Sequence, residues 1–239
     1  MSLTNSYILS DQISLYGEAD CIGFGNDEFY IKEIAKKVSN EIIIKNHYSH
    51  KVAGFATTYI YLGVFENDKL LGTLQYGFAM NAASQASVVS DTKIDEYLEL
   101  NRMWLSDEIN TKYAESQAIS FSIKYIKRKL PKIKWIQSFA DERCGGFGIV
   151  YQACSFDFYG GHTSIFWELD NEVFHNKAMT IKDVKKSNAK EKFLQENKNR
   201  AIKFELRQFR YIKFLNQKWK KKCLLEQKPY IKHYDKISA

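Results

Sequence analysis

The stretch LELNRMWLSDEINTKYAESQAISFSIKYIKRKLPKIKWIQSFADERCGGFGIVYQACSFDFYGG, residues 98–161, decides the fold. Its hydrophobic pattern predicts a strand, a helix, a strand and a short helix, at residues 98–105, 118–130, 133–140 and 149–153. The first helix carries Ile119, Ile123 and Ile126 at helical spacing, and Pro131 ends it. This order is typical of the core of an α/β transferase.

The flanking sequence extends that core. Apolar periodicity predicts a helix at 28–38, a short strand at 41–45, a hairpin of strands 58–65 and 69–78 around a polar turn, and a last strand at 164–169. With 45% hydrophobic and 15% aromatic residues, the chain of 239 residues can bury one full-sized core. We therefore expect an α/β fold with a single mixed central sheet and helices on both faces.

Polar residues follow the predicted strands where apolar ones would be expected. Asn101 and Arg102 interrupt the first strand of the core, Ser116 follows its loop, and Asp141 comes directly after the second strand. In open α/β sheets, ligands bind at the carboxyl ends of strands. Asp141 is a candidate proton acceptor, although Asp at this position is also a frequent helix N-cap.

Two further candidates lie outside these strand ends. His47 and Tyr48 stand side by side in a polar loop, where they could act as base, hydrogen-bond donor or metal ligand. Tyr151 lies on the predicted short helix, ten residues after Asp141. The alternatives are an inert surface histidine and an aromatic at the edge of the core.

Positive charge is concentrated at the end of the chain. Residues 181–239 hold 18 Lys and Arg against 6 Asp and Glu, whereas residues 1–180 hold 17 against 22. Aromatic and basic residues alternate in 207–222, which suits stacking on bases and contact with phosphates. We therefore divide the chain into a transferase domain, 1–180, and a basic, aromatic-rich extension, 181–239, packed on it. The alternative is an edge strand followed by a solvated basic helix.

Several classes of protein lack support. No apolar run approaches the roughly 20 residues that span a bilayer, and the N-terminus lacks a signal-peptide pattern. The 4 cysteines are scattered, which favours reduced thiols in the cytoplasm. The glycine signatures of dinucleotide and P-loop sites and the zinc-deaminase signature are missing. The segment 143–148 fits the pyrophosphate-binding pattern R-x-x-G-x-G, but it follows the second core strand rather than the first.

Six segments, taken in order, resemble the Mom family of phage and prophage proteins, which modify adenine in DNA. They are NHYSHK (46–51), ELNRMWL (99–105), ESQAISFSIKYIK (115–127), IKWIQSFAD (133–141), GFGIVYQACSFDFYGG (146–161) and FRYIKFLNQKWKKK (209–222). The resemblance implies a fold like that of the GCN5-related N-acetyltransferases. It also implies transfer of a carbamoylmethyl group to N6 of adenine, which would protect phage or mobile-element DNA from restriction.

The resemblance also assigns roles. Four family positions fall on His47, Tyr48, Asp141 and Tyr151 as catalytic residues, and Arg102 and Ser116 match further polar positions of the family. We expect these two, together with Asn101 beside Arg102 in the strand, to bind substrate or cofactor. It implies an acyl-type donor, acetyl-CoA-like or other, and a bound iron with His47 as a ligand. The DNA-binding candidates in the basic extension are Arg207, Arg210, Lys213, Lys218, Lys220 and Lys221.

These implications predict a partner and a location. The partner is double-stranded DNA with its target adenine flipped out, no membrane is involved, and the protein acts in the cytoplasm of the host. Two alternatives stay open: an acetyl-CoA-dependent N-acetyltransferase of protein or small-molecule amines, and a non-catalytic DNA-binding protein on the same fold.

Overall fold

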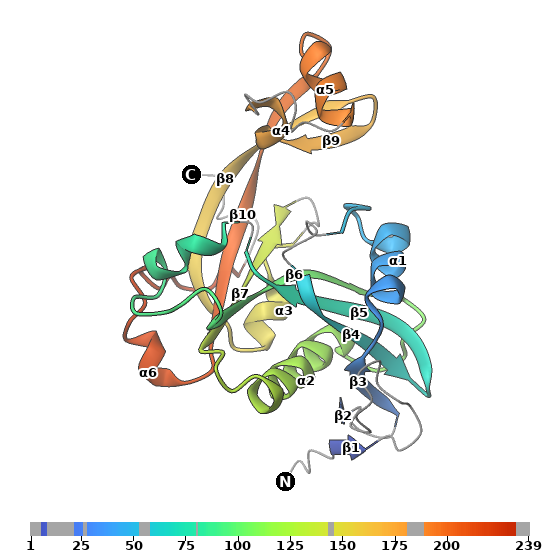
Figure 1. The fold of residues 1–239 in the computed structure, drawn as a ribbon, viewed down its shortest axis with the longest axis vertical. Helices are drawn as coiled ribbons and strands as arrows, with labels where there is room; N and C mark the ends of the chain where they lie inside the picture. Colours follow the sequence, from blue (N-terminus) through green and yellow to red (C-terminus); the bar gives the residue numbers. More distant parts are fainter. Residues whose placement is uncertain are drawn as a thin grey trace.

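The computed structural model describes residues 6–8, 22–25, 28–52, 58–79, 81–142, 146–180 and 189–232. Within these residues a 10-stranded sheet has the order β1-β2-β3-β4-β5-β6-β7-β10-β8-β9. The strands are β1 (Ser6–Ile8), β2 (Ile22–Gly25), β3 (Phe29–Glu33), β4 (Thr58–Glu66), β5 (Lys69–Gly77), β6 (Tyr97–Leu105), β7 (Trp135–Asp141), β8 (Asp157–Leu169), β9 (Glu172–His175) and β10 (Ile202–Phe214). All neighbours are antiparallel except β6 and β7, which are parallel. The predicted single mixed sheet is confirmed (Figure 1).

Helices lie on both faces of this sheet, as predicted. The helices are α1 (Lys36–Asn46), α2 (Ala114–Lys129), α3 (Ile149–Ala153), α4 (Asn176–Thr180), α5 (Ala189–Glu196) and α6 (Gln217–Lys220). Side chains alternate between the two faces of β5. Thr73 hydrogen-bonds Ser39 of α1 (2.7 Å), whereas Tyr76 hydrogen-bonds Ser122 of α2. We call these the α1 face and the α2 face; the large hydrophobic core lies on the α2 face.

The prediction of a helix at 28–38 is wrong, because the first part of this segment is strand β3. Phe29 and Ile31 enter the core beside α2, while Tyr30 turns to the other side and stacks on Phe65 at 5.2 Å. Both faces of the strand are covered, so its apolar residues do not alternate as simply as in a half-exposed strand.

The predicted strand at 41–45 is also wrong, since these residues belong to α1. Three consecutive isoleucines favour a strand locally. In the helix, only one of the three isoleucines packs fully into the protein. Ile43 is fully buried, whereas Ile44 is 51% exposed. Packing against β5 and β6 overrides the local preference.

The core stretch 98–161 folds as its pattern predicts, into β6, α2, β7 and α3. Its two strands pair over three residue pairs only, the last of which joins Glu99 and Gln137. Beyond that pair β6 continues to Leu105 and β7 to Asp141 without a common ladder. The sheet therefore opens between the carboxyl ends of β6 and β7.

The segment 202–214, predicted to belong to a C-terminal extension, is an inner strand. β10 pairs with β7 on one side and β8 on the other, so it is not an edge strand. The proposed boundary follows Thr180, the last residue of α4, and residues 181–188 beyond it lie outside the described residues, so the division into two domains stays a prediction. The far halves of β8 and β10 leave the body together as an arm that carries β9, α4 and α5 (Figure 1). The side chain of Lys51 contacts this arm at Phe174 and Val173.

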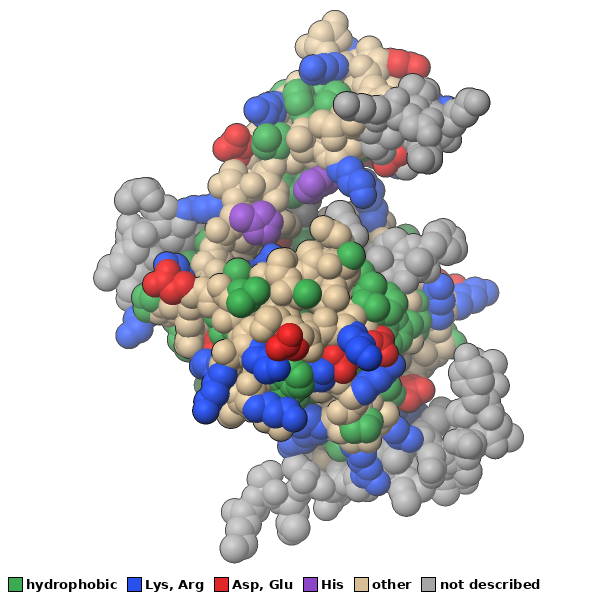
Figure 2. Space-filling view, turned by 60° about the vertical axis from the view of Figure 1, so that its left-hand side comes forward, with side chains coloured by type: hydrophobic (Ala, Val, Ile, Leu, Met, Phe, Trp, Pro, Cys, Tyr) green, Lys and Arg blue, Asp and Glu red, His purple; other side chains and the backbone are tan. Residues whose placement is uncertain are grey.

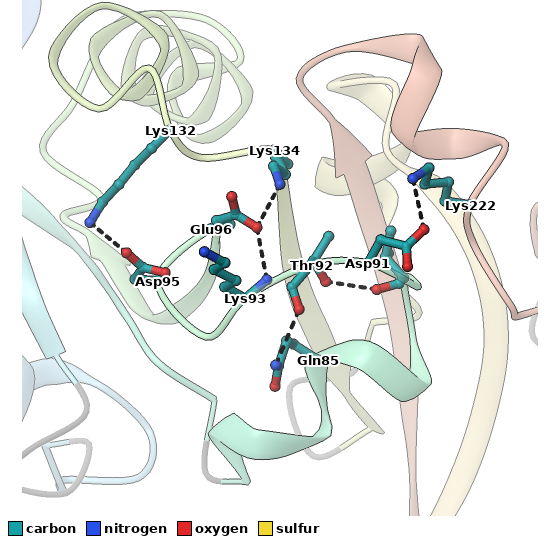
Figure 3. A network of polar contacts seen from close by, with 10 residues as sticks. Gln85, Asp91, Thr92, Lys93, Asp95, Glu96, Lys132, Lys134 and Lys222 are labelled. Atoms are coloured by element: carbon teal, nitrogen blue, oxygen red, sulfur yellow. Dashed lines mark hydrogen bonds and ion pairs between the residues drawn. The ribbon is translucent and has the colours of Figure 1, made fainter.

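The loop between β5 and β6 is fastened by lysines from later elements (Figure 3). Lys132 pairs with Asp95, Lys134 with Glu96, and Lys222 with Asp91. These pairs neutralise part of the positive charge at the end of the body that carries α6. Among the described helices, none has the length and apolar character needed to cross a membrane.

Candidate active site

The structure brings Tyr48 and Asp141 together on the α1 face. Asp141 is the last residue of β7, and Tyr48 follows α1. The Tyr48 hydroxyl donates to Oδ2 of Asp141 at 3.5 Å, a long hydrogen bond. The Asp141 residue is only 5% exposed, whereas Tyr48 is 47% exposed. A buried carboxylate thus lies beside a phenol that solvent and a substrate can reach.

His47 lies next to Tyr48 of this pair. It is buried, its ring lies 4.2 Å from the Tyr48 ring, and its Nδ1 contacts the Ser49 hydroxyl at 2.8 Å. The three residues predicted as a catalytic group in the loop after α1 and at the end of β7 therefore form one cluster. Their chemical roles stay predictions.

Asn101 and Arg102 lie at an irregularity of β6. Opposite them, Gln75 pairs with Arg102 but the next residue of β5 pairs with Leu100, so Asn101 is skipped in the ladder. Such a bulge redirects side chains. The Asn101 amide bonds the Phe78 carbonyl (3.0 Å), and Arg102 Nε donates to the Lys51 carbonyl (3.1 Å). Arg102 thereby joins the end of the His47–Tyr48 loop to β6.

Tyr151 and Ser116 lie on the α2 face instead. Tyr151 is buried in the core of that face, and its ring is 5.4 Å from Tyr211. The Ser116 hydroxyl donates to the Tyr113 carbonyl (3.0 Å) in the first turn of α2, and the Ser116 carbonyl accepts from Cys154. Among the described residues, Tyr151 therefore lies on the face of the sheet opposite to the Tyr48–Asp141 pair.

Sequence analysis missed a polar pair in the same region. Glu99 and Gln137 are cross-strand neighbours on the α1 face, and Gln137 Nε2 donates to Glu99 Oε2 at 2.7 Å. Burial raises the pKa of the Glu99 carboxyl, and the hydrogen bonds from Gln137 and Asn101 only partly oppose this. Each of the two strands carries a polar residue at a position facing α1, and this pattern could have indicated the pair. The polar residue Asn101 in the same strand obscured the pattern.

Some of the predicted DNA-binding residues already bond other groups of the protein, whereas others are exposed. Arg207 forms an ion pair with Glu142, Lys220 one with Asp157, and the Lys213 ammonium donates to two backbone carbonyls. Lys218 and Lys221 are exposed. Figure 2 shows lysines and arginines over the body interleaved with acidic side chains rather than gathered in one uniform patch.

Comparison with known proteins identifies the family. The model of the Mom protein family matches residues 28–232. The chain belongs to the Mom family. It is 40% identical over 230 residues to the protein described as methylcarbamoylase mom of Escherichia phage Mu, an alignment that covers 95% of this chain and 93% of the relative. The expected family is confirmed.

Solved structures with a similar fold include proteins described as acetyltransferases. Ribosomal-protein-S5-alanine acetyltransferase from Vibrio fischeri aligns with a TM-score of 0.48 at 11% identity, over 82% of this chain and 98% of that one. Microcin C7 self-immunity acetyltransferase MccE, solved with acetyl-CoA and AMP, aligns at 0.45 and 14% identity, over 80% of this chain and 94% of that one.

The residues of this Mom protein do not make an ordinary pyrophosphate cradle before α2. There, the backbone N–H groups of Asn110 and Thr111 donate to the Glu66 carboxylate at 2.9 and 2.8 Å, and the Thr111 hydroxyl does so at 2.6 Å. These bonds hold the pKa of Glu66 below its ordinary value. A carboxylate of the protein itself thus takes two of the amide donors of this loop, which an anionic ligand could otherwise use.

Gly148, after β7, has a packing role. Gly148 has φ +89°, and a side chain there would meet the Tyr211 ring at 2.4 Å. Close approach of two segments therefore accounts for this glycine without a phosphate. The first residues of the R-x-x-G-x-G pattern, 143–145, lie outside the described residues.

The predicted iron site is not formed by the described side chains. Among them, no group of three or more His, Cys, Asp or Glu is placed to hold a metal ion. His47 Nδ1 is engaged by Ser49, and the Asp141 carboxylate by Tyr48. We therefore derive no step through iron.

Proposed function

We propose that this protein is a DNA-modifying transferase that adds a carbamoylmethyl group to N6 of adenine. Membership of the Mom family supports a transferase, and the family resemblance supports the nucleophile. The observation that carries the proposal is the approach of Tyr48 to Asp141, because it places a buried carboxylate beside an accessible phenol at the open end of β6 and β7.

The chemistry fits these groups. The lone pair of adenine N6 is delocalised into the ring, so N6 needs a proton acceptor as it attacks. A bond forms between N6 and the methylene carbon of the donor, the bond from that carbon to its leaving group breaks, and the N6 proton passes to Asp141. Tyr48 orients Asp141 before the reaction and donates to the substrate during it. A target base inside a duplex is out of reach, so it must be flipped out.

We propose an acyl-type donor in a broad sense. Its electrophilic carbon is bonded to a carbonyl carbon. Acetyl-CoA held by its pyrophosphate before α2 is disfavoured, because Glu66 already accepts from the amides of that loop. The proposed biological role is protection of phage or mobile-element DNA from restriction in the host cytoplasm.

The test is to express the protein in a host, digest the DNA of the host to nucleosides and weigh them. The expected result is a fraction of deoxyadenosine heavier by one carbamoylmethyl group, with DNA that resists restriction enzymes whose sites contain adenine. Unmodified deoxyadenosine, in an assay where a known Mom enzyme yields product, would refute the proposal.

A further inference from the structure

Three polar side chains form a row across neighbouring strands on the α1 face. They are Glu99 of β6, Gln137 of β7 and Arg210 of β10. Glu99 is directly opposite Gln137 in the ladder, and Arg210 is opposite Phe139. Arg210 is therefore a diagonal neighbour of both Gln137 and Asp141, at the distance over which long side chains still interact.

Two groups in this row lack a hydrogen-bond partner among the described residues, namely the guanidinium of Arg210 and Oε1 of Gln137. The guanidinium of Arg210 makes no hydrogen bond to any described residue, although burial lowers its pKa; electrostatic interactions with Glu99 and then Cys223 oppose this shift. Next to it, Oε1 of Gln137 is buried without a hydrogen-bond partner. A buried amide oxygen without a partner is costly and rare in folded proteins, whereas the guanidinium of Arg210 is half-buried. A cost of this kind beside a candidate active site indicates a group kept ready for a ligand.

The surroundings of Arg210 indicate which ligand. Its guanidinium lies 5.1 Å from the centre of the Phe139 ring, and the edge of His162 meets the same ring at 5.7 Å. Phe139 is two residues before Asp141 on the same face, about 7 Å along the strand. A planar cation and aromatic rings beside the proposed proton acceptor form the kind of surface that receives a nucleobase.

Arg210 also differs from the other cations of its segment. Arg207 is paired with Glu142 and Lys220 with Asp157, so their charges are already compensated. Arg210 lies on the inner part of the sheet, where a phosphate backbone has less access than on the exposed α6.

We propose that Arg210 reads the target base. It donates to N1 of the flipped adenine while Asp141 accepts from N6 of the same edge, with the Phe139 ring beside the base. Guanine and thymine carry an N–H donor where adenine carries N1, and that donor would oppose the guanidinium and leave it unpaired. This inference rests on the proposed function and names the residue that selects its substrate.

The test compares Arg210→Lys and Arg210→Met with the wild-type protein. The matched control is Arg128→Lys, which changes an arginine that lies 6.0 Å from the ring of Phe24 at the end of α2. Plasmid DNA is treated with each protein, digested to nucleosides and weighed, and affinity for the same DNA is measured over a range of salt. Thermal unfolding of each variant checks that it is folded.

The expected result is at least a fivefold loss of adenine modification in both Arg210 variants, as for the loss of one base contact. The yield of modified cytosine relative to modified adenine should rise, because cytosine also has an acceptor beside its amine. DNA affinity and its salt slope should stay unchanged. The Arg128 variant should match the wild type.

Three outcomes would overturn the inference. A uniform loss of DNA affinity, with a salt slope reduced by about 0.9, would make Arg210 a phosphate contact. A slower reaction with unchanged base ratio and unchanged half-saturating DNA concentration would place Arg210 on the donor. Full activity of folded Arg210→Met would remove any role. If the wild-type protein itself leaves DNA unmodified, the proposed function fails first, independently of Arg210.

Discussion

The hydroxyl of Tyr48 lies 3.5 Å from Oδ2 of Asp141, although 93 residues separate them in the chain. The contact joins the loop after α1 to the end of β7, across the opening of the sheet. We predict that Asp141→Asn abolishes adenine modification, by about 100-fold or more, because the amide cannot accept the N6 proton. Tyr48→Phe should lose about tenfold, since the carboxylate remains. Nucleoside mass analysis measures both.

Asp170→Asn is the matched control for the Asp141 substitution. Asp170 is paired with Arg200 in an exposed turn of the arm, and we expect full activity from this variant. A fully active, folded Asp141→Asn would show that the pair is structural and that another group accepts the proton.

A second prediction concerns the anchor of the loop before α2. Glu66→Gln should lower the free energy of unfolding by about 1–3 kcal/mol, because a buried carboxylate that accepts from Asn110 and Thr111 loses its charge. The folded-state pKa of Glu66 is lowered, so its stabilisation is present at neutral pH and lost as pH falls through that pKa. Urea denaturation at several pH values measures the difference.

The control for this experiment is Glu108→Gln in the same loop. Glu108 pairs with Lys69, and both side chains are 64% exposed, so the expected change is below about 1 kcal/mol. Equal effects of the two substitutions would mean that Glu66 does not anchor the loop. A difference that persists unchanged at acid pH would contradict the assigned charge effect.

The elements that could be predicted from the sequence are those whose pattern is local. The hairpin turn is set by Asn67 and Asp68, which both adopt positive φ as a two-residue hairpin loop requires. The helix α2 has its apolar stripe on one side. By contrast, β3 and α1 were assigned wrongly because their packing partners, Phe65 and β5, come later in the chain.

The candidate site could be predicted only in part for the same reason. His47, Tyr48 and Asp141 are separate candidates from the local pattern, the family resemblance combines them, and the structure shows that they meet. The Glu99–Gln137 pair depends on strand register, which a single sequence does not give. Arg210 was interpreted as part of an exposed basic segment because nothing local shows that β10 lies between two other strands.

A third prediction follows from the buried Glu99 carboxyl. Its pKa is raised mainly by burial, so near this pKa a larger fraction of the carboxyl is protonated in the folded protein than in the unfolded chain. The folded protein binds more protons than the unfolded chain between the two pKa values, and stability therefore falls as pH rises through this interval. Glu99→Gln removes that dependence. We expect the variant to gain stability relative to wild type between pH 4 and pH 8, measured by thermal unfolding across this range.

The same variant tests whether the destabilisation caused by the buried Glu99 carboxyl serves function. If Glu99 supports Arg210 and the base pocket, Glu99→Gln should be more stable at pH 8 yet less active in adenine modification. Glu205→Gln, at an exposed position on β10 in the arm, should change neither property. A Glu99 variant that is less stable at pH 8 than at pH 5, relative to wild type, would contradict the raised pKa.

The last prediction compares two exposed lysines with a lysine that already forms an ion pair. Lys218 and Lys221 are exposed near α6, so both are free to meet a phosphate backbone. Lys218→Gln with Lys221→Gln should weaken DNA binding for all sequences and reduce the salt slope of log affinity by about two, since each phosphate contact releases counterions. Lys220→Gln should change the slope less, because Lys220 already pairs with Asp157. Titration of labelled duplex DNA at a series of salt concentrations measures both slopes, and an unchanged slope in the double variant would place the DNA backbone away from α6.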